Sequence, residues 1–327
     1  MTTRDENDRV NRGFVGIPTF LRAEMCLDLD RLDADIAVIG VPTDEGSPFM
    51  PGSRFAPRSL REHSLRFAPD QGIYDIETGR HYLVHEIGNR RIVDVGDCDV
   101  LPTNVERTFD NVTRDIRSIL GRSAMPVVLG GDHSITYPVV RAFDGHGPLN
   151  VIHFDAHMDY SPIAQGLSYT NGHAFRHIRA LSFVERMFQV GIRSMRTSEQ
   201  TVRDSRNDGN QVITMSAFRK LGLDAFTELL PEDARCYVSI DVDALDMSLV
   251  PGCVSAEPNG FLHDEFRDTL AAVARRVDVV GFDFVEVNPQ LDVGTGVTSY
   301  LGVQTIIGFL GQIFDQPRRV NRRAQLR

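Results

Sequence analysis

Short apolar runs, rich in β-branched residues, alternate along this chain with longer amphipathic segments. Such runs are typical of strands buried on both faces, and the segments between them repeat their apolar residues with the helical period. The strand candidates are residues 36–41, 91–95, 126–129, 150–154, 188–191, 236–240 and 279–284, and the helix candidates are 105–120, 135–143, 217–230, 264–276 and 298–313. The alternation predicts a three-layer α/β/α fold with a central, mostly parallel sheet.

The chain length allows one large α/β domain or two ordinary ones. It has 327 residues, of which 42% are hydrophobic, so it can bury a sizeable core. Neither a Ser- or Pro-rich linker nor an internal repeat interrupts the pattern. We therefore predict a single domain over residues 1–327, with residues 1–31 as an N-terminal arm and the arginine-rich residues 316–327 as a basic tail.

Composition restricts the partners of the protein. The formal net charge of −10 argues against a nucleic-acid or anionic-membrane partner. The polar N-terminus cannot form the apolar core of a signal peptide, and no apolar run reaches the roughly 20 residues that span a bilayer. The four cysteines lack CxxC spacing, so they suggest neither a disulfide framework nor a zinc knuckle. A soluble, cytoplasmic protein is expected.

Three strand candidates run directly into aspartate and histidine residues. The strands at 126–129, 150–154 and 236–240 are followed by the sequences GGDHS (130–134), DAHMD (155–159) and DVDALD (241–246). In an open parallel sheet, ligands bind at the carboxyl ends of the strands. If these strands are neighbours, six side chains converge as candidate metal ligands: His133, Asp155, His157, Asp159, Asp241 and Asp243.

The spacing of these residues supports one shared site. Residues i, i+2 and i+4 of an extended segment project to the same side, so Asp155, His157 and Asp159 do, and Asp241 and Asp243 do likewise. Taken singly, an Asp-x-Asp after a strand is usually a turn or helix cap. Together, however, four close carboxylates repel one another unless cations are bound, and a pair of divalent ions removes the repulsion. Asp and His ligands without thiolates suit Mn²⁺, with Ni²⁺, Co²⁺ or Fe²⁺ as alternatives, and do not suit Ca²⁺.

The three segments resemble the metal motifs of the ureohydrolases, the family of arginases, agmatinases and related amidinohydrolases. Residues 16–22, 51–58 and 285–289 are similar to segments of its agmatinase-like branch, so the resemblance covers nearly the whole chain. It implies an arginase-like fold and hydrolysis of a guanidino carbon–nitrogen bond with release of urea. It also implies assembly as trimers or hexamers, so a homo-oligomer is expected by analogy.

The resemblance also assigns roles to individual residues. His133 and Asp159 would bind one metal, and His157 and Asp243 the other. Asp155 and Asp241 would bridge them. The two divalent ions per chain, Mn²⁺ by expectation and Ni²⁺ as the alternative, would hold the hydroxide that attacks the guanidinium carbon. Glu286 matches the family's catalytic carboxylate that binds the substrate guanidinium.

This chain departs from the family pattern beside the metal motifs. The family carries a His-Gly pair, with a proton-carrying histidine, where this chain has Asn171-Gly172. His173 follows, and we predict that it either takes over proton transfer from a shifted backbone or lines the substrate pocket; Asn171 is a further substrate-binding candidate. The third motif continues with Asp246-Met247 in place of Asp-Pro, which changes the loop beside the metals.

These departures leave the substrate open. Agmatine, a guanidino acid and a small or N-alkylated guanidine all fit, and a formimino-group hydrolase needs the same attack on an amidine-like carbon. A different class of function is a supporting subunit in a hetero-oligomeric ureohydrolase. A metal-dependent deacetylase is a third reading, against which Glu286 and the Asp-rich pattern argue. Counting the bound metals distinguishes the amidinohydrolase from the deacetylase, because a deacetylase of this kind binds one zinc.

Overall fold

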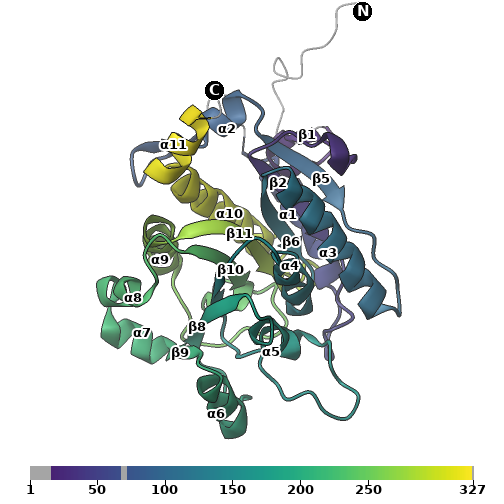
Figure 1. Cartoon of the computed structure of the whole chain (residues 1–327), viewed down its shortest axis with the longest axis vertical. Coiled ribbons are helices and arrows are strands. Elements are labelled where there is room, and N and C mark those ends of the chain that lie inside the picture. The colour runs from purple at the N-terminus through teal and green to yellow at the C-terminus, as the bar shows by residue number, and fades with distance from the viewer. Residues whose placement is uncertain (1–15, 68–71, 326–327) are drawn as a thin grey trace, which may run out of the picture.

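A central nine-stranded sheet dominates the fold (Figure 1). The computed structural model describes residues 16–67 and 72–325, with side chains to residue 321. The strand order is β1-β5-β2-β6-β11-β10-β7-β8-β9, and all neighbouring strands in this sheet are parallel. The strands are β1 (Glu24–Met25), β2 (Ile36–Val41), β5 (Ile92–Asp97), β6 (Met125–Gly130), β7 (Leu149–Phe154), β8 (Val184–Ile192), β9 (Gln211–Thr214), β10 (Arg235–Asp241) and β11 (Asp278–Val285). The predicted parallel sheet is therefore confirmed.

Helices cover both faces of the sheet, which gives the predicted three layers. The α-helices are α1 (Ala56–Ser64), α2 (Val84–Gly88), α3 (Val105–Gly121), α4 (Thr136–Arg141), α5 (Ala174–Arg179), α6 (Glu199–Asn207), α7 (Met215–Leu221), α8 (Leu223–Leu229), α9 (His263–Arg276), α10 (Val297–Phe314) and α11 (Pro317–Gln325). One core contains residues of α1, α7, α8, α9 and α10, and the other contains residues of α3, α4 and α5. In β2, Ile36 and Val38 belong to the first core while Ala37 and Ile39 belong to the second, so both strand faces are apolar.

Several elements differ from the sequence expectation. The predicted helix at 217–230 is two helices, because Gly222 between α7 and α8 has φ +82°, a left-handed conformation that breaks the helix. The short strands β1 and β9 and the antiparallel hairpin of β3 (Ile73–Asp75) and β4 (Arg80–Tyr82) were not predicted. Strands of two to four residues carry too few apolar positions to show a period.

Helix α10 is apolar because it is a core helix. It is long and apolar enough to cross a membrane by length and composition, yet 67% of it is buried inside the fold. A Cβ atom added at Gly302 would lie 2.8 Å from the Phe284 ring, so this glycine lets α10 pack closely on β11.

The two predicted terminal segments are partly described. Residues 1–15 of the predicted arm lie outside the described residues, and the rest of the arm contributes β1 to the sheet edge. The predicted basic tail contains α11, in which the Arg318 guanidinium lies 3.2 Å from Asp233.

Candidate metal centre

The carboxyl ends of four central strands bring the candidate ligands together. Strands β6, β11, β10 and β7 are consecutive in the sheet, and their register pairs Ile240 with Phe154 and Asp241 with Val285. Asp155 and Glu286, which follow these partners in sequence, therefore flank Asp241. His133 begins a short 3-10 turn just after β6, at the same edge of the sheet. The candidate residues predicted from the sequence meet at this edge because every strand of the sheet runs the same way.

The first group of ligands surrounds the ring of His133, which is fully buried. Its Nδ1 atom lies 3.0 Å from Asp155 Oδ2, 3.1 Å from Asp241 Oδ2 and 3.2 Å from Asp159 Oδ2. Burial alone would lower the pKa of His133, but hydrogen bonds with these carboxylates raise it well above its usual value. A cation bound by His133 Nδ1 and these three carboxylates would balance their negative charge in place of a proton.

The second group surrounds His157. Its Nδ1 atom lies 2.9 Å from Asp243 Oδ2 and 3.2 Å from Asp155 Oδ1. Asp155 therefore presents one oxygen to each group, as expected of a bridging ligand. Asp241 is placed less symmetrically, because its Oδ2 faces His133 whereas its Oδ1 accepts a hydrogen bond from the Asp243 amide at 2.8 Å.

The donor set fits a pair of divalent cations. Asp243 Oδ2 is buried and makes no well-directed hydrogen bond, its nearest donor being His157 Nδ1 at 2.9 Å, and burial followed by the charge of Asp155 raises the pKa of Asp243. Burial and Asp155 likewise raise the pKa of Asp159 to about 6. Burial and Asp243 raise the pKa of Asp241 well above its usual value. Cations would remove these penalties, which are those of crowded, buried carboxylates.

A polar chain behind His133 fixes the orientation of its ring. His133 Nε2 lies 2.9 Å from Ser239 Oγ, and Ser239 Oγ donates to Asp283 Oδ1 at 2.6 Å. Since the serine hydroxyl has a single proton, Nε2–H must donate to it, so Nδ1 is left as the ligand atom. Thr136 and Tyr237 also donate to Asp283, each at 2.9 Å, which anchors the chain.

The Ser239→Ala variant tests this support. We expect its metal affinity to fall about 10- to 100-fold, because His133 loses the acceptor that fixes its ring. Competitive titration with a chelator measures the change against the wild-type protein. Unchanged affinity would mean that the serine does not orient the ligand.

The stability of the metal-free protein should depend on pH. Burial and Asp132 raise the pKa of Glu286 to about 8, and the pKa of His157 is raised to about 12 because nearby Asp243 and Asp155 outweigh its burial. The folded chain therefore holds these protons more tightly than the unfolded chain does, so stability is lost as pH rises above the unfolded values. We expect metal-free protein to lose at least about 2 kcal/mol of unfolding free energy between about pH 6.5 and 8.5.

Denaturant unfolding in a chelator measures this loss, and saturating Mn²⁺ is the control. Metal binding requires deprotonated ligands, so the metal-loaded protein should not lose stability over the same range. Equal or greater stability of the metal-free protein at the higher pH would contradict the raised pKa values of Glu286 and His157.

Glu286 borders the same cluster and is buried. Its backbone has φ +65°, and its Oε1 atom accepts hydrogen bonds from the His133 amide at 2.9 Å and from Asn171 Nδ2 at 3.1 Å. Asn171 thus lies beside Glu286, in the 3-10 turn Asn171–His173. Both residues line a cleft of about 340 Å³ that also exposes His157, Asp159, Asp241 and Asp243.

His173 is not brought to this cleft. Its ring is buried, with Nδ1 2.7 Å from the Thr170 hydroxyl and Nε2 3.3 Å from the carbonyl oxygen of Pro162. A carbonyl can only accept, so Nε2 donates to it and Nδ1 accepts from Thr170. Burial also lowers the pKa of His173. This placement argues against the predicted proton-transfer and substrate-binding roles of His173.

His153 is a contributor that the sequence interpretation missed. Its Nε2 atom lies 2.7 Å from Asp155 Oδ2, and its ring stacks on Phe175 at 3.5 Å between centroids. Burial lowers the pKa of His153 to about 4, so the neutral ring donates to Asp155 and accepts from Gln189. The signal was available, because His153 precedes Asp155 by two positions on one strand face.

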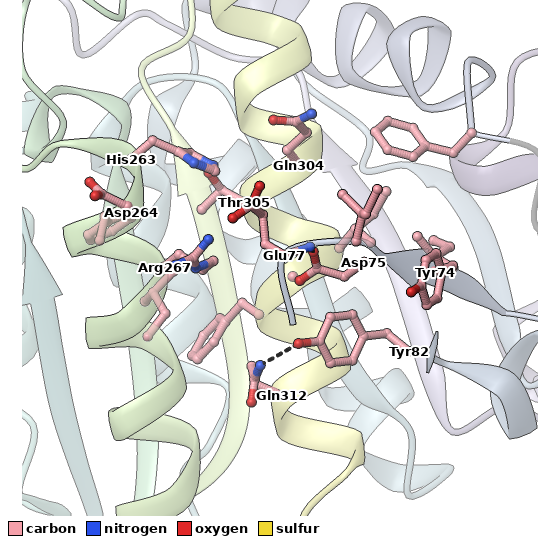
Figure 2. A pocket seen from close by; sticks show the side chains of 18 residues that line it. Tyr74, Asp75, Glu77, Tyr82, His263, Asp264, Arg267, Gln304, Thr305 and Gln312 are labelled. Carbon is pink, nitrogen blue, oxygen red and sulfur yellow. Dashed lines mark hydrogen bonds between the residues drawn. The ribbon is translucent and has the colours of Figure 1, made fainter. Parts of the chain in front are cut away.

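A larger cavity lies elsewhere. It has a volume of about 540 Å³ and is lined by the β3–β4 hairpin, α9 and α10, as Figure 2 shows with Tyr82 and Gln312 joined by a hydrogen bond. None of the candidate ligands lines it. The smaller cleft is therefore the candidate site.

Comparison with known proteins agrees with this geometry. The profile of the Arginase family matches residues 34–311. The chain is 32% identical to proclavaminate amidinohydrolase of Streptomyces clavuligerus, over 91% of this chain and 93% of that protein. It is also 32% identical to guanidinopropionase of Pseudomonas aeruginosa, over 94% of each. The crystal structure of formimidoylglutamase from Bacillus subtilis superposes with a TM-score of 0.78 at 27% identity, covering 87% of this chain and 89% of that one.

Proposed function

Because the chain belongs to the arginase family, we propose that it is a binuclear metal-dependent amidinohydrolase that releases urea from a guanidino compound. The family membership makes it a hydrolase of carbon–nitrogen bonds in linear amidines. The observation that carries the proposal is the position of Asp155, whose two carboxylate oxygens face two separate groups of Asp and His ligands. Asp241 also caps the 3-10 turn Val242–Ala244, but capping does not explain why Asp155, Asp241 and Asp243 are buried together.

The proposed chemistry divides the work between the cluster and Glu286. Two divalent cations held by the six ligands would supply an activated water at neutral pH as the nucleophile. Glu286 would hold the guanidinium through paired hydrogen bonds, since a carboxylate matches the N–H geometry of that group. Its anchoring by the His133 amide and Asn171 keeps the substrate carbon beside the cluster. Attack of water on that carbon and loss of the amine yield urea.

The names of the relatives indicate several candidate substrates for this chain. They carry the names guanidinopropionase, guanidinobutyrase and agmatinase, so both guanidino acids and agmatine remain candidates. A structural relative named formimidoylglutamase keeps the formimino reaction open. We retain Mn²⁺ as the proposed metal and Ni²⁺ as the alternative, because their preferred ligands overlap.

A substrate panel tests the proposal. Metal-free protein is reconstituted separately with Mn²⁺ and Ni²⁺ and given arginine, agmatine, guanidino acids, guanidine and N-alkylated guanidines, with urea as the readout. Urea from any member, absent in the chelated control, supports the reaction. Formamide from a formimino amino acid without urea from the panel would favour the formimino hydrolase. If neither urea nor formamide forms although two metals are bound, the result would favour a subunit that needs a partner. We propose a trimer or hexamer as the oligomeric state, and analytical ultracentrifugation measures it.

A further inference from the structure

One arginine stands in the wall of the cleft. Among the described residues that line the cleft, Arg196 is the only arginine or lysine, and Asp159, Asp241, Asp243 and Glu286 line the same cleft. Arg196 lies in the loop between β8 and α6, and 61% of its side chain is exposed. The cleft therefore presents four carboxyl groups and a single arginine.

The imidazole ring of His157 separates Arg196 from the buried carboxylates. His157 presents Nδ1 to Asp243 and Asp155, and its Nε2 atom contacts Nη2 of Arg196. The guanidinium of Arg196 thus lies beside the ligand cluster, with only the His157 ring between it and the carboxylates of Asp155 and Asp243. A substrate that contacted both Glu286 and Arg196 would need a guanidino group and an anionic group close together.

The contacts that Arg196 makes with other residues leave part of the hydrogen-bonding capacity of its guanidinium unused. Its Nε atom lies 3.5 Å from Glu257 Oε1, and its Nη2 lies 3.5 Å from the carbonyl oxygen of Ser255. Glu257 Oε1 also accepts from Ser194 Oγ at 2.7 Å and lies 3.5 Å from His157 Nε2. When His157 serves as a ligand through Nδ1, Nε2 carries a proton and cannot accept from Arg196. Glu257 is then the acceptor for His157, and Arg196 is left to face the cleft.

We propose that Arg196 binds the carboxylate of the substrate, and that the substrate is a short-chain guanidino acid. The assignment rests on the proposed amidinohydrolase function. A guanidinium paired with a carboxylate forms two parallel hydrogen bonds. Ser198 and Thr201 also line the cleft, and because their hydroxyl groups bond each other at 2.8 Å, one hydroxyl proton of the pair is left for an anion. The terminal amine of agmatine, by contrast, would place a second positive charge beside Arg196.

The test compares substrates of opposite terminal charge. Guanidinoacetate, β-guanidinopropionate and γ-guanidinobutyrate are compared with agmatine as substrates of the Mn²⁺-loaded wild-type protein, Arg196→Gln and Arg196→Lys. Arg203→Gln is the control, because Arg203 is an exposed arginine on α6 whose partner is Glu199. Metal content and calorimetric binding of the products β-alanine and putrescine are measured on the same samples.

We expect the wild-type protein to prefer the acids. In Arg196→Gln, kcat/KM for the acids should fall about 10- to 100-fold, mainly through KM, as expected for loss of a charged hydrogen bond. β-Alanine binding should weaken in parallel, whereas agmatine turnover and metal content stay constant or rise; Arg196→Lys should be intermediate and Arg203→Gln unchanged. Preference of the wild-type protein for agmatine, or equal acid turnover in Arg196→Gln, would overturn the assignment alone. No urea from any compound would overturn the proposed function and this assignment with it.

Discussion

Replacing Asp241 by Asn is expected to remove the bound divalent metals and to lower kcat/KM by more than about 10³-fold. The side chain of Asp241 contacts the first group of ligands through Oδ2, which faces His133, and its Oδ1 accepts from the backbone amide of Asp243. Asparagine preserves the shape and can keep the second contact, but it removes the negative charge. Metal analysis of the purified variant and urea release measure the loss.

The same variant carries its own control for misfolding. Burial and Asp243 penalise the ionised Asp241 of the metal-free protein, so removing its charge should stabilise that form. We therefore expect chelated Asp241→Asn to unfold at a higher temperature than the chelated wild-type protein. Asp224→Asn, which changes an exposed acid of α8, should alter neither property. Full activity of a metal-depleted Asp241→Asn protein would refute the binuclear account.

The second large effect is expected from Glu286→Gln, which should lower kcat/KM about 10²- to 10³-fold while both metals stay bound. The glutamine oxygen can still accept from the His133 amide and from Asn171, so the local structure is retained. Its amide group, however, presents a donor to the N–H groups of the guanidinium, and a buried cation is left without its counter-charge.

Steady-state kinetics and metal analysis of Glu286→Gln distinguish a role in substrate binding from a role in supporting the metal ligands. Glu199→Gln, at an exposed position of α6, is the matched control and should behave as the wild-type protein. Loss of metal from Glu286→Gln would show that the residue supports the ligands, and unchanged kinetics would show that it does not hold the substrate.

The sequence predicted most of the sheet and all six candidate ligands because both depend on simple patterns. A continuous apolar run such as β2 or β11 marks a buried strand, and parallel strands end at one edge, so the Asp and His residues after them had to meet if the strands were neighbours. The strand order itself was not predictable, because it depends on how the helices cross over the sheet. The observed order β6-β11-β10-β7 places Glu286 between His133 and Asp241.

Side-chain direction in loops was the harder part. Asn171 and His173 lie two residues apart in one 3-10 turn, yet the first contacts Glu286 and the second contacts Pro162. Spacing alone cannot separate the two, since neighbours in such a turn point to different sides. Arg196 was missed for a similar reason: its loop after β8 carries no motif, and only the fold places it against His157.

The most direct test of the binuclear mechanism is a titration of the metal-free protein with Mn²⁺, following metal bound per chain and urea released from the preferred guanidino substrate. We expect the wild-type protein to bind two ions per chain and to be fully active only when both are bound, and we expect Asp241→Asn to show neither property. Full activity at one ion per chain, or urea release that persists in a chelator, would contradict the binuclear mechanism.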